Sequence, residues 1–138
     1  MGRRPPRVTS PGMRVLVVDD STELRARLVA LIRETAPESV VDEARDGGEA
    51  LAAVEAAFPE LIILDLQLPG RGGLEILASL KQAPRAPRVL ILTNHATDPH
   101  RRECLARGAD YFFDKSMEFE EVAHVLSELR PSSMPLWP

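Results

Sequence analysis

Three aspartates follow two apolar runs that have the pattern of buried strands. Asp65 follows residues 61–64, and Asp19 and Asp20 follow residues 15–18. Because open α/β sheets place their chemistry at the carboxyl ends of parallel strands, we expect these carboxylates to share one edge of a sheet. Three clustered acids call for a divalent cation, and Mg²⁺ is a hard cation that favours oxygen ligands. The spacing therefore predicts a magnesium site made by Asp19, Asp20 and Asp65.

Two further strand-like runs end in side chains that suit a phosphoryl oxygen. One run ends in Thr93, and the other, residues 111–114, is followed by Lys115. A carboxylate such as Asp65 can accept a phosphoryl group when a cation neutralises the charge that gathers on the equatorial oxygens. Lys115 adds a second positive charge, and the Thr93 hydroxyl can donate a hydrogen bond to one of these oxygens. The set predicts a phosphorylation site.

The elements that position these residues alternate along the chain. Strand-like runs separated by amphipathic segments are typical of a parallel sheet with helices on both faces. The first expected strand begins near residue 13, and the other four span residues 40–44, 61–65, 88–93 and 111–114. The first, second and fourth expected helices span residues 22–35, 48–58 and 99–107. The third is marked by Leu74, Leu77 and Leu80, and the buried face of the fifth is expected to be Phe119, Val122, Leu126 and Leu129. The pattern predicts an α/β fold, with Ser21 or Thr22 capping the first helix.

Length and composition leave room for one domain. The chain has 138 residues and a net charge of −4, without a basic stripe that would predict direct binding to nucleic acid. No apolar run approaches membrane-spanning length, so membrane insertion is not expected. A single cysteine, Cys104, suits a reducing compartment and favours a cytoplasmic protein. We expect a disordered lead-in at residues 1–12, a folded domain at 13–130 and a flexible tail at 131–138.

Four motifs carry a family resemblance when they are taken in order on the ends of four strands. They are Val17-Val18-Asp19-Asp20-Ser21, Asp65-Leu66-Gln67-Leu68-Pro69-Gly70-Arg71-Gly72-Gly73, Leu92-Thr93, and Gly108-Ala109-Asp110-Tyr111-Phe112-Phe113-Asp114-Lys115. Together they resemble a response-regulator receiver domain of two-component signalling, over about residues 13–130. The resemblance implies a flavodoxin-like, doubly wound parallel sheet of five strands in the order 2-1-3-4-5, with five helices.

The resemblance also implies roles for individual residues. Asp65 is expected to take a phosphoryl group from a phosphohistidine on a sensor histidine kinase or phosphotransfer protein. Asp20 is expected to bind Mg²⁺ directly, Asp19 largely through water, and Gln67 through its backbone carbonyl. Such a protein is not an enzyme in the usual sense, because it catalyses only its own phosphorylation and dephosphorylation.

The family's switch maps onto Thr93 and Phe112. In this family the threonine moves toward the phosphoryl group and an aromatic on the fifth strand turns inward behind it. Counted back from Lys115 in the family pattern, that aromatic corresponds to Phe112, and its neighbour Tyr111 cannot serve the same surface because neighbouring strand residues point to opposite faces. The face made by the fourth helix, fifth strand and fifth helix is then expected to bind a downstream protein target. A plain core role for Phe112 and a homodimer that forms on phosphorylation stay open.

Several positions depart from the family pattern. Ser116 follows Lys115 where the family usually has a proline in a cis peptide. Because a cis bond before a residue other than proline costs about 3 kcal/mol, we expect this bond to be trans or the loop to be altered. Ser116 is then a candidate cap for the last helix, with Glu118 and Glu120 near its amino end. Asn94 could narrow access to Asp65, and Gln67 and His95 stand where the family tunes the lifetime of the phosphoaspartate.

Two other classes of function stay open at this point. The first is a degenerate receiver that acts as a phosphate-independent protein-interaction module, which the Ser116 and Asn94 departures favour. The second is a phosphohydrolase that uses an aspartyl phosphate, but Gln67 stands where its second acid belongs. Metal-ligand spacing is absent from His95, His100 and His124, which we expect on the surface or in loops.

Overall fold

Strands and helices alternate along the chain in the computed structural model, which describes residues 12–70, 72–94 and 96–130. The strands are β1 (Arg14–Val18), β2 (Val40–Ala44), β3 (Leu61–Leu64), β4 (Arg88–Thr93) and β5 (Tyr111–Asp114). The helices are α1 (Thr22–Thr35), α2 (Gly47–Ala56), α3 (Gly73–Gln82), α4 (Asp98–Ala106) and α5 (Glu121–Leu129). The expected alternation is confirmed.

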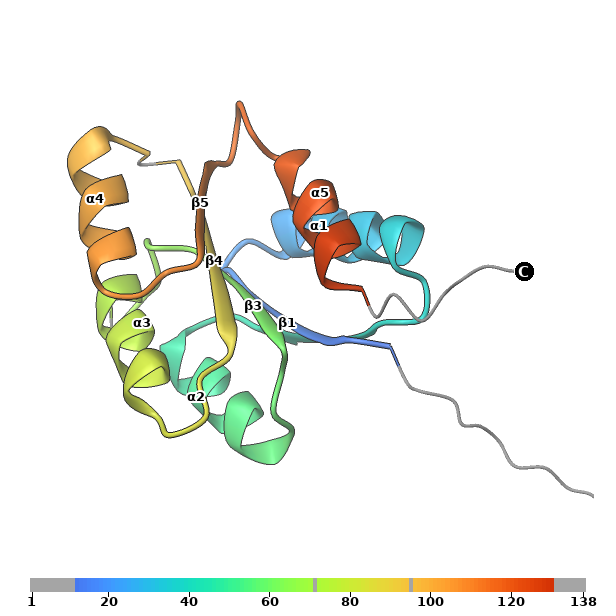
Figure 1. Ribbon diagram of the computed structural model, residues 1–138, viewed down its shortest axis with the longest axis horizontal. Coiled ribbons are helices and arrows are strands. Elements are labelled where there is room, and N and C mark those ends of the chain that lie inside the picture. Colours follow the sequence, from blue (N-terminus) through green and yellow to red (C-terminus); the bar gives the residue numbers. More distant parts are fainter. Residues whose placement is uncertain (1–11, 71, 95, 131–138) are drawn as a thin grey trace, which may run out of the picture.

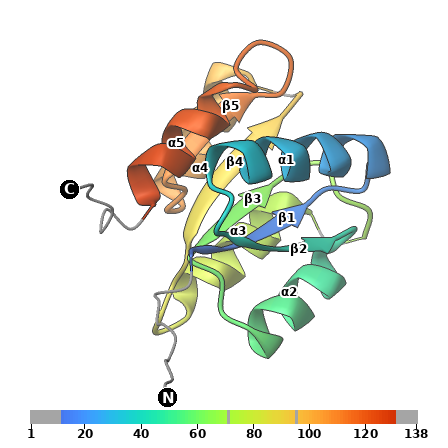
Figure 2. The same cartoon turned by 90° about the vertical axis from the view of Figure 1, so that its right-hand side faces the viewer.

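The strands form one parallel sheet in the order β2-β1-β3-β4-β5. This is the flavodoxin-like order that the motifs predicted. Helices α1 and α5 cover one face of the sheet, and α2, α3 and α4 cover the other (Figures 1 and 2). Because the central strands are buried on both faces, β3 is apolar throughout, and all four of its residues are buried.

Two hydrophobic clusters hold the layers together. On the α1 and α5 side, Leu28, Ile32 and Leu126 pack against sheet residues such as Val17 and Ile63. The cluster on the other side contains Ile76, Leu77, Leu80, Cys104 and Phe112. On α3 the buried residues Gly73, Ile76, Leu77 and Leu80 follow the i, i+3, i+4 and i+7 spacing of an amphipathic helix. These two clusters fix the strands and thereby the positions at which their carboxyl ends meet.

The ends of the first two helices follow from local chemistry. The Ser21 side chain accepts a hydrogen bond from the Leu24 N–H at 3.1 Å, so Ser21, one of the two expected caps, is the N-cap of α1. The Asp46 side chain caps α2 in the same way through the Glu49 N–H. The expected helix at 48–58 ends earlier, at Ala56, because Pro59 disfavours helical backbone at the residue before it.

The prediction that Ser116 caps the last helix is wrong. Helix α5 begins at Glu121, and residues 115–120 form turns. The Asp114 carboxylate Oδ1 accepts hydrogen bonds from the backbone N–H groups of Ser116 at 2.7 Å and Met117 at 2.9 Å. The Asp114 carboxylate therefore stabilises the turn after β5, and the helix begins only beyond that turn. Within the described residues no peptide bond is cis, as expected for Lys115–Ser116.

Candidate phosphoacceptor and metal site

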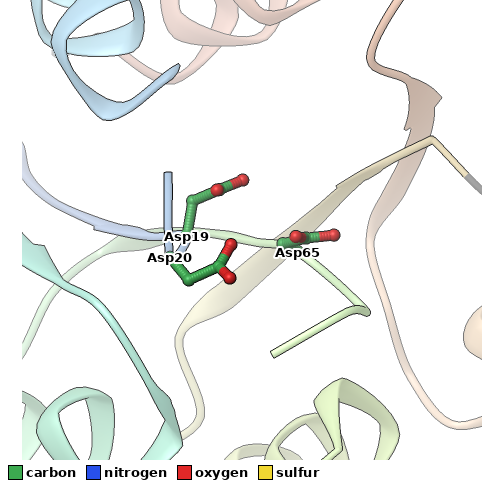
Figure 3. A group of neighbouring side chains, drawn as sticks. All are labelled: Asp19, Asp20 and Asp65. Atoms are coloured by element: carbon green, nitrogen blue, oxygen red, sulfur yellow. The ribbon is translucent and has the colours of Figure 1, made fainter. Parts of the chain in front are cut away.

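The carboxyl edge of the sheet brings together the predicted site residues. Asp19 and Asp20 follow β1, Asp65 follows β3, Thr93 ends β4, and Lys115 follows β5. Figure 3 shows Asp19 and Asp20 side by side at the end of one strand and Asp65 at the end of its neighbour. One oxygen from each of the three carboxylates lies within 4.8 Å of the others. Residues that are far apart in the sequence thus form a single charged cluster.

The two buried carboxylates of this cluster are held in the same way. Asp19 and Asp65 are 2% and 4% exposed, whereas Asp20 is exposed. Asp19 Oδ1 accepts a hydrogen bond from the Ser21 N–H at 2.8 Å, and Asp65 Oδ1 accepts one from the Gln67 N–H at 3.1 Å. One oxygen of each buried group is therefore fixed by the backbone two residues further on. The other oxygen is directed toward the centre of the site.

Lys115 connects those second oxygens. Its ammonium lies 2.7 Å from Asp19 Oδ2 and 3.1 Å from Asp65 Oδ2. Burial raises the pKa of Asp65, and the charge of Asp19 adds to this, while the Gln67 N–H and Lys115 oppose it. Burial alone would lower the pKa of Lys115, but hydrogen bonds and charges from Asp19 and Asp65 outweigh it, so that pKa is raised. The ammonium contacts two of the three carboxylates, so one positive charge faces three negative charges and the cluster keeps net negative charge for a cation to neutralise.

The carboxylate cluster fits a hard divalent cation by its chemistry. All three groups offer oxygen atoms, as Mg²⁺ requires, and exposed Asp20 gives access from solvent. A hollow of about 340 Å³ adjoins them, lined by Asp19, Asp20, Ser21, Asp65, Gln67, Asn94 and Lys115. Across the part of the chain that the structure describes, no other acidic, histidine or cysteine group has this arrangement.

The loop after Asp65 folds back tightly onto the acceptor. A Cβ atom on Gly73 would lie 2.5 Å from Leu66 Cα and 2.7 Å from the Asp65 carbonyl oxygen, so only glycine fits there. The Gly73 N–H donates to the Leu66 carbonyl at 3.1 Å. Helix α3 thus begins directly behind Asp65. This contact explains why the motif places glycine at the start of α3.

The remaining predicted residues lie around the cluster. Thr93 is fully buried at the end of β4, and Asn94 is exposed at the rim of the hollow. Phe112 is 2% exposed and lies on the α4 side of the sheet, opposite Tyr111 and Phe113, which confirms the alternation of faces. His95 lies outside the described residues, as do residues 1–11 and 131–138, so their predicted roles and disorder stay predictions.

Arg25 is a site-positioning residue that the sequence reasoning missed. It is 8% exposed, and its guanidinium donates to the Asp19 backbone carbonyl at 2.6 Å and to Glu43 on β2 at 3.0 Å. It therefore fixes the backbone that carries Asp19 and Asp20. A signal for this was present, because Arg25, Leu28 and Ile32 share one helical face, where a charged residue needs a buried partner.

Cys104 and a second, larger hollow belong to the scaffold. Cys104 is fully buried in α4, and burial raises the pKa of its thiol to about 11. A hollow of about 640 Å³ lies at the other end of the sheet, near Met13, Phe58 and Arg85. It contains none of the predicted site residues, so the smaller hollow is the functional candidate. The described helices include none that is both long and apolar enough to span a bilayer.

Comparison with known proteins identifies the family of this chain. The family model described as the response regulator receiver domain matches residues 15–127. The chain belongs to the response regulator receiver family. It is 34% identical over 124 residues to the nitrate/nitrite response regulator NarL of Escherichia coli K12, covering 88% of this chain and 56% of that protein. It is 37% identical over 122 residues to the two-component response regulator PhoP of Pseudomonas aeruginosa, covering 88% and 53%.

A solved structure of this family has the same fold. The signal receiver domain of the putative response regulator NarL from Mycobacterium tuberculosis superposes with a TM-score of 0.75 at 28% identity. The match covers 84% of this chain and 94% of that one. The receiver domain described here spans about half the length of the two curated relatives. The family assignment thus applies to the receiver part of such proteins.

Proposed function

We propose that Asp65 is the phosphoacceptor of a two-component phosphorelay. It takes a phosphoryl group from a phosphohistidine on a sensor histidine kinase or phosphotransfer protein. The observation that carries this is the placement of Asp65: a buried carboxylate, fixed on one oxygen by the Gln67 N–H and contacted on the other by Lys115, beside two further acids. Because burial raises the Asp65 pKa, its anion is poorly solvated and correspondingly more nucleophilic.

The transfer forms one O–P bond and breaks one N–P bond. An Asp65 oxygen attacks phosphorus, and the imidazole of the donor leaves with the bonding electron pair. Lys115 lies closer to Asp19, at 2.7 Å, than to Asp65, at 3.1 Å, so it can move to a phosphoryl oxygen while it stays anchored on Asp19. Thr93 donates its hydroxyl hydrogen bond to another of these oxygens.

Mg²⁺ is the proposed cofactor, held by Asp19, Asp20, Asp65 and the backbone carbonyl of Gln67. It supplies positive charge that offsets the charge on the equatorial phosphoryl oxygens. Asp20 is the exposed member of the set and is proposed to bind the ion directly, with Asp19 acting largely through water. Arg25 keeps the peptide of Asp19 in place while the ion binds and leaves.

The proposed output is a change in the α4-β5-α5 face. Thr93 moves toward the phosphoryl group, Phe112 packs behind it, and the face then binds a downstream protein target. Thr93 and Phe112 are both buried in the structure, so the proposed switch rests on the packing of buried side chains. The NarL and PhoP relatives are response regulators, which supports a signalling role for this domain.

The test is intact mass after incubation with Mg²⁺ and a small phosphoryl donor. The native protein and Glu55→Gln, a control at an exposed acid on α2, are expected to gain one phosphoryl group. Asp65→Asn is expected to gain none. A folded native protein that gains nothing at any Mg²⁺ concentration would contradict the proposal and favour the phosphate-independent interaction module.

A second variant separates the metal from the acceptor. Asp20→Asn retains the acceptor Asp65 and its contact with Lys115 but removes one charge from the cluster. Its phosphorylation is expected to be slow at low Mg²⁺ and to recover as Mg²⁺ is raised, because weaker binding is overcome by mass action. If the phosphorylation rates of the native protein and Asp20→Asn depend on Mg²⁺ in the same way, the role of Asp20 as a metal ligand is contradicted. The role of Asp65 as phosphoacceptor would not be affected by that result.

A further inference from the structure

Helix α4 is attached to the sheet through little buried surface. Cys104 is its one buried residue, whereas α3 buries Gly73, Ile76, Leu77 and Leu80. The helix lies beside β5 at the edge of the sheet (Figure 1). An element with few buried apolar contacts opens locally at low free-energy cost. Polar contacts at its surface therefore have a large share in keeping α4 in place.

Arg101 makes the polar contacts that join α4 to β5. Its Nη1 donates to the Phe112 backbone carbonyl at 3.0 Å. The same guanidinium lies 4.9 Å from the centre of the Phe112 ring, within range of a cation–π interaction. One side chain on α4 thus holds both the backbone and the ring of the proposed switch residue. The planar guanidinium can make both contacts together, which an ammonium cannot.

A third contact extends this arrangement into the loop before α5. Arg101 Nη2 lies 3.6 Å from Glu118, and Glu118 accepts a hydrogen bond from the Asp114 N–H at 3.0 Å. Asp114 in turn holds the N–H of Ser116. Lys115 lies between Asp114 and Ser116 and contacts the acidic cluster. A continuous set of contacts therefore runs from α4 to the ammonium that contacts Asp65.

We propose that Arg101 is a latch that keeps α4 packed on β5 and couples that packing to the loop carrying Lys115. Loss of the Arg101 contacts would release α4 from β5 and weaken the contacts of Glu118 and Asp114. In the other direction, a movement of Lys115 would reach α4 through the same residues. The regulatory meaning of this coupling rests on the proposed function. The packing of α4 can be tested without any phosphoryl donor, so failure of one is distinguishable from failure of the other.

The chain contains its own probe for the latch. Cys104 is the single cysteine, lies three residues after Arg101 on α4, and is fully buried with a pKa of about 11. A thiol reagent can therefore label it only when α4 opens. Arg101→Ala is expected to raise the labelling rate about fivefold, from the combined loss of the carbonyl and ring contacts. Arg102→Ala, at the exposed neighbouring position, is the matched control and is expected to leave the rate unchanged.

The dependence of labelling on urea separates local from global opening. Local release of α4 exposes little surface, so the rate is expected to change weakly with low urea. Arg101→Lys keeps the charge but not the planar group and is expected to rescue the rate only in part. Equal rates in Arg101→Ala and Arg102→Ala, or a steep urea dependence in Arg101→Ala, would overturn the latch.

The coupling to the loop has its own readout in amide NMR shifts. The Lys115 and Ser116 signals are expected to move in Arg101→Ala and in Glu118→Gln, which removes the charge at 3.6 Å from Arg101. They are expected to stay in place in Arg102→Ala. Faster labelling of Cys104 with unmoved Lys115 and Ser116 signals would show that Arg101 holds α4 alone, and would overturn the coupling.

Discussion

Helices α1 and α4 each carry an arginine that donates to a backbone carbonyl of the sheet edge they cover, directly after β1 in one case and within β5 in the other, but the two arginines lie in different surroundings. Arg25 on α1 is buried and donates to the Asp19 carbonyl, next to buried Leu28 and Ile32. Arg101 on α4 donates to the Phe112 carbonyl with a side chain that is 40% exposed. The same kind of contact therefore fixes the backbone of Asp19 beside α1 and attaches a helix with little buried surface at α4. The difference lies in how much apolar surface surrounds the arginine.

Truncation of a leucine on each helix gives the largest expected contrast. Leu28 is 1% exposed on α1, and Leu105 is 45% exposed on α4. Leu28→Ala removes buried methyl groups and leaves a cavity, so we expect it to lower the free energy of unfolding by about 2–5 kcal/mol. The same change at Leu105 is expected to cost under about 0.5 kcal/mol. Urea unfolding monitored by circular dichroism measures both, and similar losses would show that α4 is as firmly packed as α1.

The two arginines are expected to differ by a smaller amount. Arg25→Ala leaves a buried carbonyl at Asp19 without its charged donor, so we expect a loss of about 2–3 kcal/mol. Arg101→Ala breaks more exposed contacts and is expected to cost about 1 kcal/mol. Chemical denaturation gives both values, with Arg33→Gln, exposed on α1, as the control. A larger loss for Arg101 than for Arg25 would reverse the comparison.

Stability against pH tests the electrostatic side of the contrast, because the α1 end faces the acidic cluster and α4 does not. Folding raises the Asp65 pKa above its ordinary value of 3.8, so the folded state binds more protons above that pH. Without metal, the cost of a charged Asp65 is absent below pH 3.8 and grows as pH rises through the raised pKa. We therefore expect Asp65→Asn to be more stable than the native protein at neutral pH and equal to it near pH 3.

Lys115 does not disturb this comparison in acid. Its raised pKa gives a contribution that is complete below its ordinary value of 10.5 and is lost only as pH rises through the folded-state value. Thermal unfolding from pH 3 to 8 is the measurement. Mg²⁺ is expected to raise the melting temperature of the native protein at neutral pH and to raise that of Asp65→Asn less. A less stable Asp65→Asn at neutral pH without metal would contradict the electrostatic account.

The sequence predicted most of the fold because its signals are local or periodic. Apolar runs such as residues 61–64 mark buried strands, and Ser21 marks a helix start that the structure confirms. The start of the last helix was placed too early, at Ser116, because Asp114, a strand residue in the pattern, has a carboxylate that organises the following turn. Hydrophobic periodicity carries no signal for a side chain that hydrogen-bonds to the backbone next to it.

The site divides in the same way between sequence and structure. Residue type and strand order determined that Asp19, Asp20, Asp65, Thr93 and Lys115 share one edge, because parallel strands end on the same side. Only the tertiary structure decided that Lys115 contacts Asp19 more closely than Asp65, and that Arg25 and Arg101 donate to backbone carbonyls after β1 and within β5. Long side chains choose partners from several within reach, and packing of the helices on the sheet makes that choice.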